Sequence, residues 1–314
     1  MNVLELWRYP VKSMGGERVD ATTIGERGVH GDRLWAVRDE DKAVITNAKR
    51  LPALLSCSAR FVREPDPEVG PGNIPDVIVT LPDGSTIRSD DPEVHARLSS
   101  VLGRRVTLGA LRPASDRAHY RAAKATGDDM REQFAIDAGE ALPDFSMMPI
   151  GKLLELGKYA TPPGTYFDAM ALHVVTVASL DAMRAKAPES DFDVRRFRPN
   201  IVVEASEQGM IELGWTGGTL TLGACTAFVD CATPRCSMPT RAQPGLRADP
   251  KLLKAIVHEA ERCLGAYATV TRAGTVRVGD DVRFEAAASS KLGEWARARA
   301  TGLKRMLLRA AMPK

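Results

Sequence analysis

The chain of 314 residues lacks the long apolar runs and paired cysteines that mark membrane-spanning and disulfide-rich secreted proteins. No apolar stretch approaches the roughly 20 residues that a bilayer-spanning helix needs, and the first residues show no cleavable signal. The five cysteines are odd in number and widely scattered. This argues against a disulfide framework and for a reducing compartment. We therefore expect a cytoplasmic protein.

Several binding signatures are also missing. The sequence has no glycine-rich nucleotide fingerprint and no cysteine cluster spaced for an iron–sulfur centre. Cys231 and Cys236 are five residues apart without a histidine pair beside them, a spacing that does not suit zinc. We expect neither zinc nor an iron–sulfur cluster in this chain.

The chain has no strong net charge: its total is +3, and most of the positive excess lies at the C-terminal end. Residues 291–314 hold seven Lys or Arg and one Glu, a charge of +6, so residues 1–290 carry about −3. A mildly acidic body is a poor nucleic-acid binder, and we expect no nucleic-acid partner. In the tail, apolar residues fall at helical spacing among the basic ones. Residues 291–314 either pack on the body or bind a partner or an anionic membrane surface, which would make the protein membrane-peripheral.

Short apolar segments between turn residues dominate the first third of the chain and predict a small β-barrel or sandwich. A helix is expected over residues 92–102, with Asp91 as N-cap and Gly103 as C-cap. A Pro-Asp-Gly-Ser run at residues 82–85 indicates a hairpin. The expected strands cover residues 3–9, 18–24, 34–38, 43–46, 55–62 and 76–81.

The fold class expected for the whole chain is mainly β with peripheral helices (α+β). Residues 112–150 are polar and read as a connecting segment with short helices. We expect an N-terminal β-barrel-like domain over 1–111, this connection, a second β-barrel domain over 151–287 and a helical tail over 288–314. Helices are expected at 151–160, at 180–186 with Ser179 as N-cap, and at 251–263. Strands are expected at 173–177, 200–204, 219–222, 225–230, 267–272, 274–276 and 281–285.

Two stretches of the second half carry groups suited to chemistry. Residues 195–203 place three guanidiniums and the amide of Asn200 at the start of an apolar strand, and Arg235 directly precedes Cys236. Fixed guanidiniums suit a phosphate or another planar anion, and a thiol beside a cation ionises more easily. The pattern predicts an anionic ligand next to a reactive thiol. The remaining cysteines Cys57, Cys225 and Cys263 fall in apolar segments and are expected in the core.

Four motifs occur in an order that resembles the MOSC family, preceded by its N-terminal MOSC β-barrel domain. They are residues 9–13 (YPVKS), 28–35 (GVHGDRLW), 196–203 (RFRPNIVV) and 234–236 (PRC). The resemblance covers residues 1–287. Within this family, the chain is similar to the amidoxime-reducing molybdenum proteins. It implies a molybdenum cofactor, whose pterin dithiolene holds the metal while a protein cysteine supplies one more sulfur. A soft thiolate suits such a metal.

The resemblance also implies roles for single residues. Cys236 would be the metal ligand and catalytic residue. The expected cofactor-binding residues are Lys12, Ser13 and Arg33 at the phosphate, Arg198 and Asn200 at the pterin, Arg235 beside the cysteine, and Ser179. A helix-capping role alone would explain Ser179. Arg195, Arg196, His30 and His173 are interpreted as mainly structural.

The sequence departs from the family pattern at two places. Thr233 stands where many relatives carry a second cysteine, and residues 237–242 lack the acid that often follows the ligand. The function implied is reduction of small N-hydroxylated (N–O) substrates with electrons from a separate donor protein. Two alternatives stay open: a sulfur carrier that uses a Cys236 persulfide, and a non-enzymatic protein that binds molybdenum cofactor.

Overall fold

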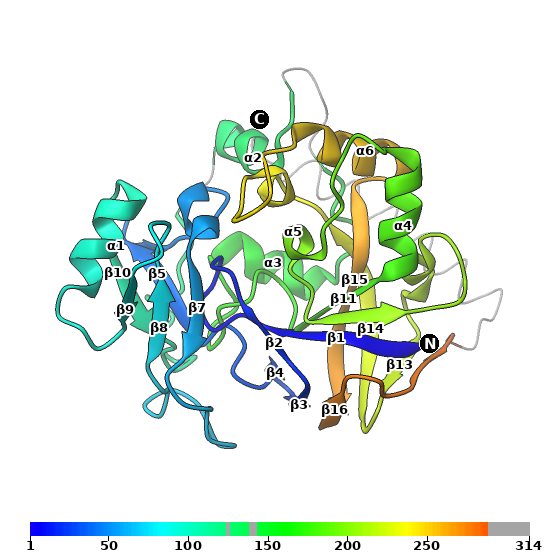
Figure 1. Cartoon of the computed structure of the whole chain (residues 1–314), viewed down its shortest axis with the longest axis horizontal. Coiled ribbons are helices and arrows are strands. Elements are labelled where there is room, and N and C mark those ends of the chain that lie inside the picture. The colour runs from blue at the N-terminus through cyan, green and yellow to red at the C-terminus, as the bar shows by residue number, and fades with distance from the viewer. Residues whose placement is uncertain (124–125, 138–142, 288–314) are drawn as a thin grey trace.

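The computed structural model describes residues 1–123, 126–137 and 143–287, and its architecture is mainly β with a few peripheral helices (Figure 1). Its largest sheet has eight strands in the order β17-β13-β14-β15-β11-β12-β1-β2. Only β11 and β12 pair in parallel there; the other neighbours are antiparallel. The strands are β1 (Asn2–Arg8), β2 (Glu17–Val19), β11 (Leu172–Thr176), β12 (Ile201–Glu204), β13 (Thr219–Leu222), β14 (Cys225–Pro234), β15 (Cys263–Arg272) and β17 (Val282–Glu285).

Three smaller sheets of three strands each complete the β structure of the described residues. The first holds β10 (Val106–Ala110), β5 (Trp35–Asp39) and β6 (Val44–Ile45). The second holds β7 (Ser58–Phe61), β8 (Val77–Thr80) and β9 (Thr86–Arg88). The third joins β16 (Gly274–Arg277) to β3 (Ala21–Gly25) and β4 (Gly28–Val29).

The two main hydrophobic cores do not coincide with the N-terminal and C-terminal halves of the sequence. One core forms around the β5 and β8 sheets and helix α1 (Val94–Leu102), with Val37, Val79 and Leu98 essentially unexposed. A second core lies on the eight-stranded sheet and includes Leu6 of β1 together with Val174 of β11. The expected domain boundary at residue 111 is therefore a division of the sequence, whereas in space β1 to β4 complete the sheets of the C-terminal half.

Helices cover the sheet edges. Helices α4 (Val177–Lys186) and α6 (Pro250–Ala260) lie side by side in Figure 1 and share a third apolar cluster with Phe197 of the short helix α5 (Val194–Phe197). Between the two halves lie α2 (Gly127–Phe134) and α3 (Ile150–Lys158). Three 3₁₀ turns span Pro52–Ser56, Ile211–Trp215 and Met238–Thr240.

Most expected elements are present, and several differ in ways that have physical reasons. The 82–85 hairpin joins β8 to β9, and Gly103 ends α1 in the left-handed conformation. The N-cap of α1 is Glu93, not Asp91. The segment 18–24 is broken at Asp20 into β2 and β3, which belong to different sheets.

The elements around the predicted site show larger differences. Thr176, not Ser179, caps α4, because the Thr176 hydroxyl accepts from the Ser179 backbone N–H at 3.1 Å. Strand β14 continues four residues beyond the expected end at residue 230, to Pro234. The arginine-rich stretch begins as helix α5, which was not expected, and ends at Arg198 in the left-handed conformation. Both changes bring the two predicted stretches toward the same end of the sheet.

Two further expectations concern membranes. No helix in the described part of the chain combines the length and apolar character that crossing a bilayer requires. The helix expected over 288–314, with its proposed membrane or partner contact, lies outside the described residues.

Because of His119, the free energy of unfolding should decrease as the pH is lowered from about 6.5 to about 4. The ring is buried, and its Nε2 lies 2.9 Å from the hydroxyl of Tyr166, which donates to the Ala110 carbonyl. Burial lowers the pKa of His119 to about 4. In this range the unfolded chain binds a proton that the folded chain does not, so stability drops by up to about 1.4 kcal/mol per pH unit.

Urea unfolding at about pH 7 and about pH 4.5 would measure this loss. His119→Gln, which cannot titrate, should show a shallower decline with acid than wild type, although it is less stable at neutral pH. An equally steep decline in both proteins would contradict the assignment to His119.

Candidate functional site

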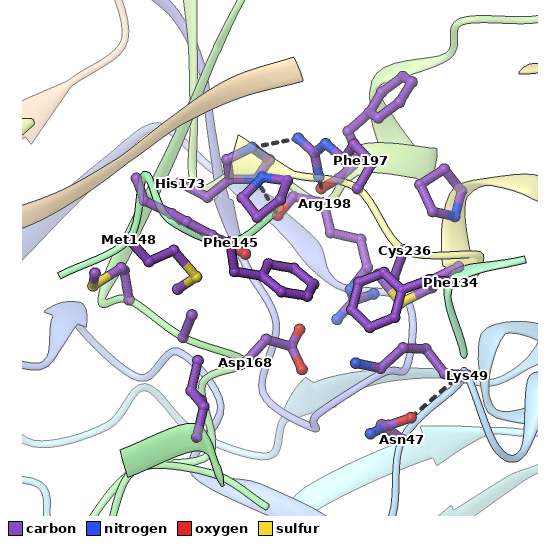
Figure 2. Close-up of a pocket in the computed structure, with 18 of the residues that line it drawn as sticks. Asn47, Lys49, Phe134, Phe145, Met148, Asp168, His173, Phe197, Arg198 and Cys236 are labelled. Atoms are coloured by element: carbon purple, nitrogen blue, oxygen red, sulfur yellow. Dashed lines mark hydrogen bonds between the residues drawn. The ribbon is translucent and has the colours of Figure 1, made fainter. Parts of the chain in front are cut away.

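A cavity of about 140 Å³ lies where the two halves of the molecule meet. Figure 2 shows its labelled lining residues converging from distant parts of the sequence. The loop after β6 supplies Asn47 and Lys49, and the segment before β11 supplies Asp168. The lining also includes Arg33, Phe134, Phe145, Met148, Leu156, Ala169, Met170, His173, Phe197, Arg198, Pro234, Arg235, Cys236, Met238, Pro239 and Tyr267.

Cys236 is the cysteine that this cavity presents. Strand β14 ends at Pro234, the Arg235 N–H donates to the Arg262 carbonyl, and a 3₁₀ turn begins two residues after Cys236. Cys236 is partly exposed, whereas the other four cysteines are buried. Burial raises the pKa of the Cys57, Cys225 and Cys263 thiols to about 11. Of the five thiols, Cys236 is the one placed to ligate or react.

Arg235 is fixed directly behind the cysteine. Its guanidinium donates to the backbone carbonyls of Leu264 and Phe197, and its Nη2 lies 2.6 Å from His173 Nε2. Burial first, and then the Arg235 charge, hold the pKa of His173 well below its usual value. A neutral His173 can accept a hydrogen bond from the Arg235 guanidinium at Nε2 while its Nδ1–H donates to the Arg198 carbonyl at 3.4 Å. Arg235 therefore supplies a fixed positive charge, and the protein already occupies its donors.

Arg198 differs because one of its donors is unused. The side chain is buried, its Nη1 donates to the Met14 carbonyl, and its guanidinium lies over the Tyr9 ring at 4.1 Å. Its Nη2 is buried without a hydrogen-bond partner in the described structure. Burial lowers the pKa of Arg198 to about 10. Leaving a buried charged donor unpaired costs about 1–3 kcal/mol or more, so this atom points to an acceptor that a ligand would supply.

Three of the predicted site residues share an uncommon backbone. Ser13, Arg33 and Arg198 have φ values of 68°, 51° and 53°. The left-handed region is unfavourable for residues with a side chain, and such strain concentrates at ligand-binding and active sites. Arg33 lines the cavity, with its guanidinium over the rings of Tyr9 and Phe167 and bonded to Asp32 at 3.0 Å.

Lys12 lies behind the cavity wall. Its Nζ donates to the Tyr166 carbonyl at 3.0 Å and to Asp168 Oδ1 at 2.6 Å. The Lys12 side chain is 2% exposed and that of Asp168 is 42% exposed, so the carboxylate stands between the amine and the cavity. Burial would raise the pKa of Asp168, but Lys12, Lys49 and Arg33 outweigh it and lower this pKa far below the usual range. Asp168 is ionised at neutral pH.

Three predicted residues lie outside the lining. The Ser13 hydroxyl accepts from the Ala48 N–H at 3.1 Å. Asn200 is buried between strands, where its Oδ1 accepts from the His173 N–H at 3.3 Å. Ser179 donates to the buried Glu212 at 2.6 Å. In this structure these side chains bind protein groups and shape the surroundings of the site.

Arg195 and Arg196, which were interpreted as mainly structural, have different surroundings. Arg195 is bonded to Asp193 on the surface. Arg196 is buried and donates to the carbonyls of Pro239, Arg241 and Arg247, so it holds the loop that follows Cys236. Sequence reasoning did not identify Asp168, Lys49 or Asn47, which lie in loops without a motif.

Comparison with known proteins gives matches to two domain models. Residues 1–91 match the MOSC N-terminal beta barrel domain, and residues 162–283 match the MOSC domain. Among solved structures, the chain is similar to the YuaD protein from Bacillus subtilis, at 13% identity and a TM-score of 0.42, covering 91% of this chain and 96% of that one. It is also similar to YiiM from Geobacillus stearothermophilus, at 17% identity and a TM-score of 0.30, covering 37% of this chain and 54% of that one. No curated protein matches.

Proposed function

The chain belongs to the MOSC family, with that family's N-terminal β-barrel domain ahead of its MOSC domain, and from this premise we propose that it is a molybdenum-cofactor-dependent reductase of N-hydroxylated compounds. The family supports a role connected with the molybdenum cofactor. The reaction, the substrate and the electron donor are our proposal.

The observation that carries the proposal is the pairing of a half-buried thiol with an unsatisfied guanidinium at one cavity. Cys236 offers the soft sulfur that a thiophilic metal prefers. Arg198 Nη2, with Arg33 and Lys49 on the same lining, offers cations to an anionic group. These residues fit the cofactor's chemistry. The cavity of about 140 Å³ is smaller than typical ligand pockets of roughly 300–1,000 Å³, so the cofactor would extend beyond it or displace side chains that narrow it.

When bound, the cofactor would supply a metal able to take an oxygen atom from an N–O bond. The chain's own residues bind and position. Arg235 sets a positive charge beside the Cys236 sulfur, and His173 keeps that guanidinium in place. Because the pKa values of His173 and Asp168 are both far below neutral, His173 is neutral and Asp168 is ionised at pH 7, so neither group serves as the acid that protonates the substrate.

The net reaction converts R–NH–OH to R–NH₂ and water by taking up two electrons and two protons. We propose that a separate donor protein supplies the electrons and that solvent supplies the protons.

The test is reduction of benzamidoxime to benzamidine by protein purified from a host that makes the cofactor. Chemically reduced methyl viologen would supply electrons, and chromatography would quantify benzamidine. We expect turnover in proportion to bound molybdenum. Bound cofactor without turnover would favour a binding protein, and one extra sulfur atom on Cys236 without molybdenum would favour a sulfur carrier.

A further inference from the structure

The outer surface of the eight-stranded sheet is uncovered around Phe228 of β14. Side chains alternate along a strand, and Leu220 of β13 and Ala227 of β14 lie in the core on the inner side, so their neighbours point outward. Phe228 is one of these outward residues and is 40% exposed. We call this area the Phe228 face. Its other members, on β13, β14 and β15, which run side by side in Figure 1, are Thr219, Thr221, Thr226, Asp230, Thr269 and Thr271.

Helix α3 covers the adjoining part of the sheet but leaves apolar side chains of its own in solvent. Its inner side packs against the apolar cluster around Cys231, which directly follows the Phe228 face on β14. On the same helix, Ile150 is 56% exposed and Leu154 is 72% exposed. Apolar surface left in water costs about 25 cal/mol per Å². A partner with apolar side chains would therefore gain free energy by covering Phe228.

The last described strand places the end of the described chain beside this face. Strand β17 is an edge strand, and the register puts Glu285, Thr219, Phe228 and Thr269 opposite one another in a row across four strands. Neighbouring strands lie about 4.8 Å apart, so Phe228 is roughly 10 Å from Glu285. An extended chain spans up to about 3.5 Å per residue. The segment 288–314, which begins three residues after Glu285, therefore starts within reach of Phe228.

The composition of segment 288–314 complements the Phe228 face. Its apolar residues at helical spacing are Leu303, Met306, Leu307 and Ala310. Seven basic residues and one acid accompany them. The face carries the carboxylates of Asp230 and Glu285, and within the described ranges neither of them forms an ion pair; Asp230 accepts only from the Thr269 hydroxyl, at 2.8 Å. Apolar and basic groups of the segment thus meet apolar and acidic groups of the face.

We propose that segment 288–314 docks on the Phe228 face of its own chain, with its apolar residues over Phe228 and its basic residues near Asp230 and Glu285. This inference goes beyond the proposed function and does not depend on it. The docked segment would cover apolar surface next to the edge strand β17, where an uncovered sheet edge invites pairing with a second copy.

Photo-cross-linking in the full-length chain tests the contact directly. Phe228→p-benzoylphenylalanine would be irradiated, and mass spectrometry of the digested protein would locate the products. The control is Val62→p-benzoylphenylalanine, because Val62 is similarly exposed (37%) but follows β7 in another sheet. We expect cross-links to residues 288–314 to be at least about tenfold more abundant from position 228, since the group reacts only with atoms it contacts.

Mixing ¹⁵N-labelled and unlabelled chains before irradiation identifies the chain that supplies the segment. Products within one chain support the proposal. Products that join a labelled to an unlabelled chain would show that a second copy occupies the face, and would overturn it. The proposal is also wrong if position 228 gives no product with residues 288–314 while wild type floats with phosphatidylcholine–phosphatidylglycerol vesicles, because the segment then binds a membrane surface instead.

Trypsin cleavage provides a second measurement that needs no cross-linker. A docked segment is protected, and the cleavage rate follows the population of the released form. We expect Phe228→Asp to be cleaved after Lys304 and Arg305 at least about fivefold faster than wild type. Val62→Asp should be cleaved at the wild-type rate. Circular dichroism would confirm that both variants are folded, and equal rates in all three proteins would overturn the proposal.

Discussion

Cys236→Ser should lower the turnover of N–O substrates by at least about a thousandfold, equivalent to roughly 4 kcal/mol of transition-state stabilisation. The reason is chemical: serine keeps the size of the side chain but replaces a soft thiolate by a hard hydroxyl, which is a poor ligand for a thiophilic metal. The fold should persist, because Cys236 is partly exposed and contributes little to the core. Turnover per bound molybdenum, measured beside the circular dichroism spectrum, checks both statements.

The chain offers a matched control in Cys225→Ala. Cys225 is unexposed in the core of the eight-stranded sheet, on the same strand that leads to Cys236. Removing its sulfur should cost about 1–2 kcal/mol of stability through the cavity it leaves, while turnover per bound molybdenum stays near wild type. If Cys236→Ser keeps wild-type turnover per molybdenum, the sulfur of Cys236 is not the ligand that the reaction needs.

Arg198→Lys should reduce the pterin content of the purified protein by at least about tenfold, because the charge remains while the Nη2 donor is lost. In the structure Nη1 donates to the Met14 carbonyl, whereas Nη2 is a buried donor without a partner among the described residues and is free for an anionic ligand. Lysine has one amine on a flexible stem and cannot satisfy the carbonyl and hold a ligand in the same fork geometry. Pterin fluorescence after acid release, normalised to folded protein, measures the loss.

Arg195→Lys is the control for this change. It lies three residues earlier, it is bonded to Asp193 on the surface, and it does not line the cavity. Its pterin content should equal that of wild type. Equal pterin content in Arg198→Lys and Arg195→Lys would show that the unsatisfied guanidinium is not a cofactor-binding group.

A strand could be predicted with its correct ends where turn residues such as glycine stand directly before and after it. Residues 219–222 alternate threonine and leucine, and glycines stand on both sides, so a strand was expected there and β13 has the expected ends. Strand β14 was expected to stop at residue 230. Its continuation depends on pairing with β15 as far as Cys263, a long-range contact that local patterns do not encode. The placement of β1 in the sheet of the C-terminal half is the same kind of contact.

The candidate site was predictable where motifs mark it. Arg33, Arg198, Arg235 and Cys236 were chosen from the sequence, and the structure gathers them around one cavity. Lys12 was also chosen from the sequence. It does not line the cavity itself but forms an ion pair with Asp168, which does. The roles of these residues remain predictions.

The remaining wall could not be predicted. Asp168, Lys49 and Phe134 come from loops or from the segment that was read as a polar connection. Only tertiary contacts bring these residues close to Cys236. For example, the Ser237 N–H donates to the Gln133 carbonyl, which places the end of α2 beside the loop that contains Cys236. Nothing in the spacing of residues 126–137 indicates that contact.

The most direct test of the central claim is a molybdenum and pterin analysis of wild-type protein purified from a cofactor-competent host. Inductively coupled plasma mass spectrometry would give the metal, and fluorescence of the oxidised pterin would give the organic part. We expect equimolar molybdenum and pterin, both retained through gel filtration. Protein that carries neither, from a host that loads other molybdenum proteins in parallel, would contradict the account.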